Sequence, residues 1–360
     1  MKKEVKRNKI QRDYTRQVPN PEDFQRFDLS GGNPWFRDLI DEWVRELPLD
    51  TLIHFPDNFS RVKALLADWL GVPSDMLFIN NGSDSIIELL PRVFLKSDAS
   101  VVVPVPTFFR FIQASERNCN NVIKVRFGNN FVWTPAFLER FLTSVNDPSV
   151  KLAWLASPNN PTGLCIPPAM LKEVLRTGKL VVLDRALNGF APDLRKDTYL
   201  LEEYPNLIIL SSFSKNFGLA GLRFGFSLAS PSNTQKLREY SLPFTVSGPS
   251  LWFMERFLHC LVQGVVSGED SASIESSRLE LENSLRTIPG LEVVSGSQAN
   301  FLMFRHSMEP DLFGRLKDSG ILVADLNNTS GIEGEGFVRM TIRSVSENRK
   351  FVEKLKEIVG

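Results

Sequence analysis

The sequence predicts an α/β protein with a large, doubly wound, mostly parallel sheet and a smaller α+β unit. Between residues 77 and 230, short β-rich runs alternate with stretches of helical periodicity. Several of these runs are almost continuously hydrophobic, which is typical of strands buried on both faces of a parallel sheet. The runs are ASVVVP, NVIKVRF, KLAWLA, KLVVLD, NLIILSS and LRFGFSLA. Their alternation with helices indicates a doubly wound domain.

The segment before these strands is predicted to be helical. In PWFRDLIDEWVREL, apolar residues recur every three or four positions, and FSRVKALLADWLG repeats the pattern up to Gly71. A stripe of this kind is typical of one buried face of a helix, so residues 34–70 are expected to be helical.

The C-terminal third has a different order of elements. Helical patterns over residues 251–266 and 271–288 precede the strand-like runs LEVVS, NFLMFR, ILVAD and FVRMTIR, with further helices over 309–318 and 347–358. We therefore expect three parts. Residues 1–33 form an N-terminal arm and entry segment, 34–245 a large domain, and 246–360 a small domain that the N-terminal segment joins.

The composition restricts the classes of function. Basic and acidic residues number 42 each, so a broad basic surface for nucleic acid or anionic membrane is not expected, although residues 1–16 form a basic arm. No apolar run approaches the roughly 18 residues of a membrane span. Three dispersed cysteines and three histidines without ligand-like spacing indicate a cytoplasmic enzyme with neither disulfide nor metal.

Candidate chemical groups follow several strands, where ligands bind in open α/β sheets. NLIILSS is followed by FSKNFGLAGLRFGF, which places Lys215 just past a strand. A lysine there is a candidate Schiff-base nucleophile, and nearby hydroxyls and a guanidinium could hold a phosphate. These phosphate candidates are Ser212, Ser214 and Arg223. KLVVLD ends on Asp184, an acid at the end of a buried strand.

Three further turns add to this set. In INNGSDSIIELL, the backbone amides of Gly82, Ser83 and Asp84 would form an anion cup at a helix N-terminus. SPNNPTG offers the Asn160 amide, and PVPTFFRF offers Phe108 as an aromatic platform. Each of these has an ordinary explanation alone, such as a helix cap, a turn or a core side chain. Their joint order is what indicates a site.

With these motifs, the chain resembles the fold-type I pyridoxal-phosphate enzymes of the aspartate aminotransferase superfamily. SPNNPTG and FSKNFGLAGLRFGF carry the resemblance, which extends from about residue 21 to the C-terminus. Within the superfamily, GGNPW, HFPDNFSRVKALLADWLGV, NFLMFR, ILVAD and FVRMTIRSVSEN are similar to the branch of histidinol-phosphate aminotransferases and threonine-phosphate decarboxylases.

The resemblance implies pyridoxal 5′-phosphate as cofactor and a role for each candidate. Lys215 would carry the cofactor as a Schiff base and move the Cα proton, and Asp184 would pair with the pyridinium nitrogen. Asn160 would bind the ring 3′-oxygen, and Phe108 would stack on the ring. The phosphate end would be held by Gly82, Ser83, Asp84, Ser212, Ser214 and Arg223. Arg339 would bind the substrate carboxylate, with Asp28, Asn33, Phe55 and Asn160 as candidates to line the substrate site.

Three positions depart from the family pattern. Leu187 stands where a tyrosine usually donates to the 3′-oxygen, and Phe55 stands where a tyrosine of the neighbouring subunit usually reaches the phosphate. Ala324 replaces an arginine of the phosphorylated-substrate enzymes, a loss worth about 1.5–3 kcal/mol for a charge-assisted pair. A non-phosphorylated substrate is therefore expected, unless Arg343 supplies the missing charge.

The resemblance also implies a homodimer with the active site between its two subunits. Two reactions stay open. The first is transamination of an amino acid, the commonest activity of the superfamily. The second is a lyase-type reaction at the same Cα: β/γ-elimination with cyclisation, as in capreomycidine or enduracididine formation, or decarboxylation as in the threonine-phosphate enzymes. A binding protein that has only kept the fold is the third hypothesis, which the retained Lys215 and Asp184 disfavour.

Overall fold

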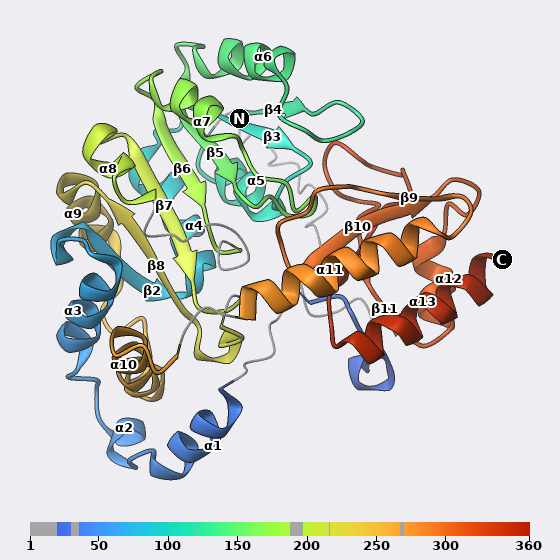
Figure 1. Cartoon of the computed structure of the whole chain (residues 1–360). Coiled ribbons are helices and arrows are strands. Elements are labelled where there is room, and N and C mark those ends of the chain that lie inside the picture. The colour runs from blue at the N-terminus through green and yellow to red at the C-terminus, as the bar shows by residue number, and fades with distance from the viewer. Residues whose placement is uncertain (1–19, 30–35, 120, 188–196, 216, 267–269) are drawn as a thin grey trace, which may run out of the picture.

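The chain folds into a large unit and a small unit, seen side by side in a computed structural model (Figure 1). The structure describes residues 20–29, 36–119, 121–187, 197–215, 217–266 and 270–360. The large unit is built on a seven-stranded sheet and the small one on a four-stranded sheet. The predicted fold class is confirmed.

The large sheet has the strand order β2-β8-β7-β6-β5-β3-β4. Only β8 runs antiparallel to the other strands of this sheet. The carboxyl ends of the parallel strands and the start of β8 therefore lie along one edge. The strands are β2 (Leu77–Asn81), β3 (Ser100–Val105), β4 (Asn121–Arg126), β5 (Val150–Ala156), β6 (Leu180–Asp184), β7 (Leu207–Ser212) and β8 (Phe224–Ala229).

Two layers of helices cover the two faces of this sheet. In β6, Val181 and Leu183 belong to one hydrophobic core and Val182 to the other, as strand alternation requires. The first core also receives α3 (Phe59–Leu70), α6 (Pro135–Val145), α7 (Pro168–Leu175), α8 (Leu200–Glu203) and α10 (Gly248–Val262). The second receives α4 (Gly82–Phe94), α5 (Phe109–Glu116) and α9 (Pro231–Tyr240). This arrangement is the predicted doubly wound domain.

The end of α3 shows how the sequence sets a helix boundary. Gly71 adopts a left-handed conformation with φ of 68°, and the amide of Val72 donates to the Ala67 carbonyl at 3.0 Å. Glycine reaches this conformation without a Cβ clash, so the helix stops where the sequence predicts. Before it, α1 (Arg37–Glu46) and α2 (Asp50–Ile53) cross the same side of the molecule, and Trp43 packs on Phe253 of α10.

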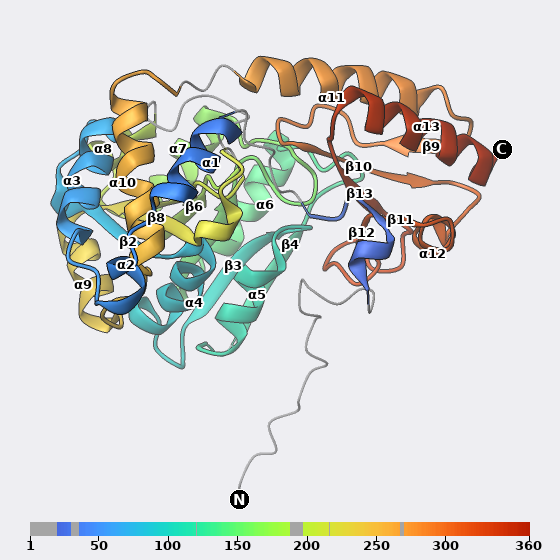
Figure 2. The same ribbon diagram turned by 90° about the horizontal axis from the view of Figure 1, so that it is seen from below.

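The small unit has an antiparallel sheet of order β12-β13-β10-β9 with helices on it (Figure 2). The strands are β9 (Leu291–Val293), β10 (Phe301–His306), β12 (Ala324–Asp325) and β13 (Val338–Thr341), and the helices are α11 (Asp270–Arg286), α12 (Leu312–Asp318) and α13 (Val345–Val359). A separate pair joins β1 (Gln25–Arg26) in parallel to β11 (Ile321–Leu322), and Phe27 enters the small core. The entry segment thus packs with the C-terminal third.

The division at residue 245 stays a prediction. Since α10 packs in the core of the large unit, we would place the start of the small unit after Val262. Short 3-10 turns occur at Pro21–Asp23, Ser74–Met76 and Ala220–Leu222. Within the described ranges, no helix has both the length and the apolar character needed to cross a bilayer.

Candidate active site

A cavity of about 430 Å³ lies at the carboxyl edge of the large sheet and reaches the small unit. Most of its side chains come from strand ends, which is where ligands bind in open α/β sheets. It is lined by Arg26, Leu29, Ser83, Asp84, Phe108, Ala156, Pro158, Asn160, Asp184, Ala186, Leu187, Ser212, Ser214, Lys215, Ala220, Arg223 and Arg339. The structure therefore brings nearly all the predicted site residues together.

The start of α4 forms a close-packed cup with Arg223. Gly82 has φ of 73°, and a Cβ there would lie 2.6 Å from Arg223 Nη2. A Cβ on Gly225 would lie 2.2 Å from the amide nitrogen of Ser83, so both positions require glycine. The first amides of a helix have no intrahelical acceptor and favour an anion. Amides and guanidinium thus meet at one place in the cavity.

Arg223 is held in an unusual backbone conformation. Its φ of 50° is in the left-handed region that glycine favours, and it caps the 3-10 turn at Ala220–Leu222. Such a conformation in a non-glycine residue costs free energy and persists only where the surroundings impose it. On the other side of the cup, Ser212 and Ser214 are both buried, and the Ser214 amide donates to Ser212 Oγ at 3.3 Å.

Asp184 ends β6 with its carboxylate buried in the cavity. Burial raises its pKa to about 7, although the amide of Ala186 donates to Oδ1 at 2.8 Å and acts in the opposite direction. A carboxylate in this position gains from a cationic partner, because burial penalises only the charged form. The site therefore favours a positive group opposite Asp184.

Lys215 lies just past β7 and lines the same cavity. Burial lowers the pKa of its ammonium to about 8, and the positive charge of Arg339 acts in the same direction. Lys215 therefore loses its proton more readily than an exposed lysine. A free amine can act as a nucleophile and as a base.

Arg339 reaches the cavity from β13 of the small unit. Its Nη2 donates to the Asp28 carbonyl at 2.9 Å, its Nη1 donates to Asn160 Oδ1, and its guanidinium carbon is 4.8 Å from the centre of the Phe301 ring. These contacts fix the planar guanidinium in one orientation. Asn160 and Arg339, which the sequence predicts separately, therefore act as one unit between the two parts of the molecule.

Two apolar side chains complete the wall. Phe108 immediately precedes α5 and makes edge contacts with Phe109 and Phe111. Leu187 is buried against Ala299 and Phe301. The position where the family has a tyrosine thus faces the cavity without a hydrogen-bond donor.

Four predicted residues are not among those that line the cavity: Gly82, Asp28, Asn33 and Phe55. Gly82 packs against Arg223 in the cup, and Asp28 accepts from Arg339 through its carbonyl. Phe55 has 77% of its surface exposed and its ring lies 4.7 Å from that of Phe244, so its predicted role across a subunit boundary stays a prediction. Asn33 lies outside the described residues. Arg343, the candidate substitute for the missing charge, is not among the lining residues; its Nε lies 3.6 Å from Glu347 Oε1.

Sequence reasoning missed several lining residues. Leu29, Ala156, Pro158, Ala186 and Ala220 are neighbours of predicted residues and contribute shape. Arg26 is different, because it brings a charge. No motif marks it; the only signal is an arginine two residues before an aspartate, which would share a face in a strand.

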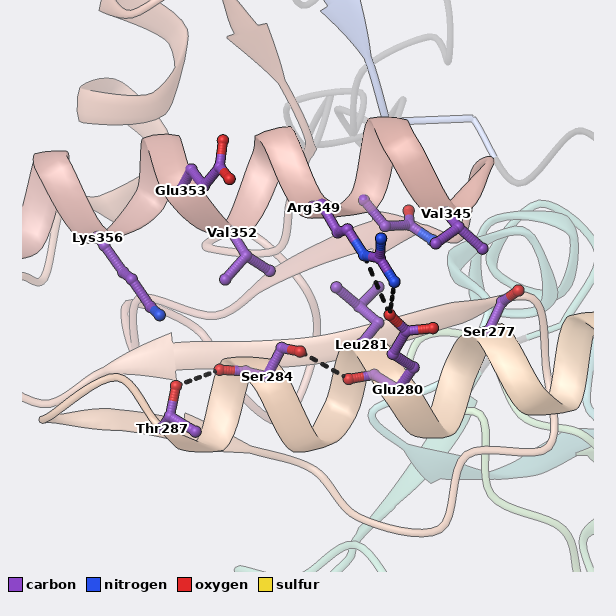
Figure 3. A pocket seen from close by; sticks show the side chains of 11 residues that line it. Ser277, Glu280, Leu281, Ser284, Thr287, Val345, Arg349, Val352, Glu353 and Lys356 are labelled. Atoms are coloured by element: carbon purple, nitrogen blue, oxygen red, sulfur yellow. Dashed lines mark hydrogen bonds and ion pairs between the residues drawn. The ribbon is translucent and has the colours of Figure 1, made fainter.

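A second cavity of about 330 Å³ lies between α11 and α13 of the small unit (Figure 3). Arg349 of α13 and Glu280 of α11 pair across it, with Nη2 and Oε1 2.9 Å apart. It contains none of the predicted site residues. We call it the α11–α13 groove.

The first cavity suits pyridoxal 5′-phosphate by the chemistry of its donors. The cup of helix amides, serines and Arg223 fits a phosphate, and the glycines at 82 and 225 let the backbone approach it. The buried Asp184 fits a protonated ring nitrogen, and Phe108 offers a ring face.

Comparison with known proteins agrees with this fit. The family model described as aminotransferase class I and II matches residues 51–355. Histidinol-phosphate aminotransferase 2 of Nitrosococcus oceani is 29% identical, covering 97% of this chain and 96% of its own. Histidinol-phosphate aminotransferase of Brevibacillus brevis is 32% identical, with 86% and 84% covered.

Solved structures show the same fold. The histidinol-phosphate aminotransferase of Clostridium acetobutylicum superimposes with a TM-score of 0.78 at 22% identity, covering 92% of this chain and 98% of that one. The L-threonine-O-3-phosphate decarboxylase of Porphyromonas gingivalis gives the same TM-score and coverage at 19% identity. The neighbour from Sinorhizobium meliloti was solved with pyridoxal-5′-phosphate. The chain belongs to the aminotransferase class I and II family and is a pyridoxal-phosphate-dependent aminotransferase.

Proposed function

We propose that the chain transfers the amino group of a non-phosphorylated amino acid to a 2-oxo acid. The observation that carries this proposal is that Lys215 and Asp184 line the same cavity as the Asn160–Arg339 pair. A base, an acid partner for the cofactor and a carboxylate receptor are thus within one enclosed space.

The described residues divide between the two ends of the cofactor. The α4 amides, Ser212, Ser214 and Arg223 hold its phosphate, while Asp184, Asn160 and Phe108 hold its ring. When bound, pyridoxal phosphate withdraws electrons from the substrate Cα and so makes its proton acidic. Asp184 is ionised when it faces a cationic ring nitrogen, because an opposite charge favours the charged form of a carboxyl.

Lys215 would hold the cofactor covalently through Nζ and would then move the substrate proton. After the amino substrate displaces it, the Nζ amine accepts the proton from Cα and returns it to the cofactor side. Its pKa of about 8 suits this task, because a base works best when its pKa is near the operating pH.

Arg339 binds the α-carboxylate of the substrate. Its guanidinium is buried and oriented by Asn160 and by the Asp28 carbonyl, so little rotamer entropy is lost on binding. Hydrogen bonds to a charged group of this kind contribute about 1.5–3 kcal/mol. They place Cα in reach of Lys215.

We propose a substrate without a phosphate, although the relatives are named for a phosphorylated substrate. Ala324 lies directly opposite Arg339 in the β12–β13 pair, so the two residues share a face of the sheet. The charge that the phosphorylated-substrate enzymes place there is missing, and Arg343 pairs with Glu347.

Leu187 favours a second candidate, a lyase-type reaction at the same Cα. This leucine lines the cavity where a hydrogen-bond donor to the cofactor is usual in the family. Without a donor at this position, the 3′-oxygen of a bound cofactor would lack a hydrogen bond that stabilises its ionised form. Elimination with cyclisation or decarboxylation would use the same Lys215, with a different bond broken.

A donor screen without acceptor separates the two reactions. Purified holoenzyme is mixed with a panel of amino acids, including arginine, hydroxyarginine, threonine phosphate and histidinol phosphate, and followed by stopped-flow absorbance and mass spectrometry. A transaminase converts the cofactor to its amino form with one equivalent of oxo acid or aldehyde. Many turnovers that release water or carbon dioxide would instead assign the lyase reaction.

We further propose a homodimer in the cytoplasm. The support is an exposed apolar surface, here called the α2 patch, in which the Phe55 and Phe244 rings are in contact and α2 lies beside Gly248. Its members are Leu49, Leu52, Ile53, Phe55, Leu242 and Phe244, each 60–79% exposed. Apolar surface of this kind usually marks an interface. All three cysteines are free, in keeping with a reducing compartment.

Sedimentation equilibrium tests the dimer. Leu52→Asp should shift the population toward monomer, because it buries a charge in the contact, and should reduce turnover. Met308→Asp, a change at an exposed apolar residue of the small unit outside the α2 patch, is the control. A wild-type monomer with full activity would refute the proposal.

A further inference from the structure

Arg26 lines the active-site cavity, and none of the steps above uses it. It lies on β1, where its neighbour Phe27 is buried in the small core. The pairing extends one residue past β1, since the Phe27 amide donates to the Leu322 carbonyl at 2.7 Å, and side chains alternate there, with Phe27 in the core and Arg26 in the cavity. The placement of the arginine is therefore set by the pairing of β1 with β11.

Asp28 holds the Arg26 guanidinium at two points. Nε donates to Oδ1 at 3.0 Å and Nη2 donates to Oδ2 at 2.8 Å. This fork uses one edge of the guanidinium, and among the described residues nothing accepts a hydrogen bond from Nη1. The side chain of Asp28 is 8% exposed and that of Arg26 is 36% exposed, so the arginine is the more accessible partner of the pair.

The other cations of the cavity already have partners in the proposed function. Arg223 faces the cofactor phosphate, Arg339 the α-carboxylate, and Lys215 the cofactor itself. Arg26 remains for the rest of the substrate. It lies on the entry segment whose Asp28 carbonyl orients Arg339, so the two arginines are placed by the same stretch of chain.

We propose that Arg26 is a specificity-determining residue that binds a distal carboxylate of the amino substrate. This inference rests on the proposed function, whose substrate it narrows to amino acids with a second acidic group. Asp28 takes Nε and Nη2 of Arg26, so Nη1 can donate to one oxygen of a carboxylate, and Asp28 repels a singly charged group less than a doubly charged one. A phosphate of charge near −2 would lie close to Asp28 with no arginine at position 324 to balance it.

Calorimetric titration of holoenzyme tests the inference without turnover. The probes are unbranched dicarboxylates of four to seven carbons, monocarboxylates of equal length, and ω-phosphono carboxylates of the same series. Wild-type protein should bind the best dicarboxylate roughly tenfold or more tightly than its monocarboxylate. Arg26→Gln should remove this preference, while Arg343→Gln, the control at an arginine outside the lining, should keep it.

Each outcome bears on one of the two proposals. Equal binding of the paired probes by wild type, or a preference that persists in Arg26→Gln, overturns the inference. A stronger preference for the phosphono probes overturns the choice of carboxylate. If Arg26→Gln loses cofactor absorbance or unfolds, Arg26→Met, which keeps the apolar stem, carries the same comparison. A wild type that binds dicarboxylates in this way but converts no donor refutes the proposed function alone.

Discussion

The active-site cavity and the α11–α13 groove are similar in size and differ in how they are built. The active-site cavity is lined by side chains from several strand ends and from both units. Burial raises the pKa of Asp184 and lowers the pKa of Lys215. The α11–α13 groove is made by one pair of helices and is crossed by an exposed ion pair. Convergence of buried polar groups therefore marks a functional site better than volume does.

The largest expected effect is on turnover, when one lysine in each cavity is replaced by alanine. Lys215→Ala should lower turnover at least 10³-fold, because it removes the proposed base and the covalent attachment. Lys356→Ala in the groove should leave turnover within about twofold, since surface substitutions change little. Initial rates and borohydride trapping with peptide mass spectrometry measure both effects. Persisting turnover in Lys215→Ala would show that the lysine is misassigned.

A second prediction concerns the stability of cofactor-free protein. The folded-state pKa of Asp184 is raised from 3.8 to about 7, so its carboxyl destabilises the fold progressively as pH rises from about 4, with the full cost present above about 7. The shift corresponds to at most about 4 kcal/mol. Asp184→Asn should therefore raise the Tm of the cofactor-free protein more at pH 8 than at pH 5.

Asp184→Asn should stabilise the cofactor-free protein but lower the activity of the loaded enzyme. The two measurements therefore separate the cost of burying Asp184 from its role as partner of the ring nitrogen. Without the negative partner of the ring nitrogen, kcat should fall by roughly tenfold or more. Thermal scans at the two pH values and initial rates of the loaded enzyme provide the measurements. An equal gain in Tm at both pH values would mean that Asp184 is ionised in the fold at low pH.

Leu187→Tyr, also in the active-site cavity, should have a smaller effect than either substitution above. It should change the pH dependence of the cofactor's absorbance. A hydroxyl at this position can donate to the cofactor oxygen and favour its ionised form. One hydrogen bond to a charged group, about 1.5 kcal/mol, corresponds to a fall of about one unit in the pH midpoint of the cofactor's absorbance change. Leu187→Phe, which adds the ring without the hydroxyl, is the control. The same fall in both variants would assign it to packing instead of hydrogen bonding.

Much of the large sheet and of the active-site cavity could be predicted from the sequence. The continuous apolar runs indicated strands covered on both faces, and the residues after them, such as Asp184, Asn160 and Lys215, line one cavity because parallel strands end at the same edge. Helix starts were less accurate. The pattern predicts a helix from residue 251, but α10 begins at Gly248, where Ser247 accepts from the Ser250 amide at 3.3 Å. Pro249 in the first turn resembles a loop signal and is in fact favourable there.

Contacts between distant segments could not be predicted. Arg26 enters the cavity because β1 pairs with β11. The ILVAD run predicts a strand at β11, but the two-residue β1 has no periodicity to detect, and nothing in the sequence pairs the two. The α11–α13 groove arises in the same way, from two helices whose contact depends on the small core. In both cases tertiary packing decides the contact, which the local propensity of each segment does not encode.

The smallest expected effect is in the groove and tests the comparison from the other side. Both partners of the Glu280–Arg349 pair are about half exposed or more, so the pair should contribute about 0.2–1 kcal/mol to the free energy of unfolding. Arg349→Gln should lower the free energy of unfolding slightly in low salt. In 1 M salt the difference from wild type should vanish, because salt screens exposed charges. Urea unfolding at two salt concentrations measures this, with turnover recorded alongside. If Arg349→Gln instead changed KM or kcat severalfold, the groove would be coupled to the active site, and convergence of buried polar groups would no longer suffice to recognise function in this fold.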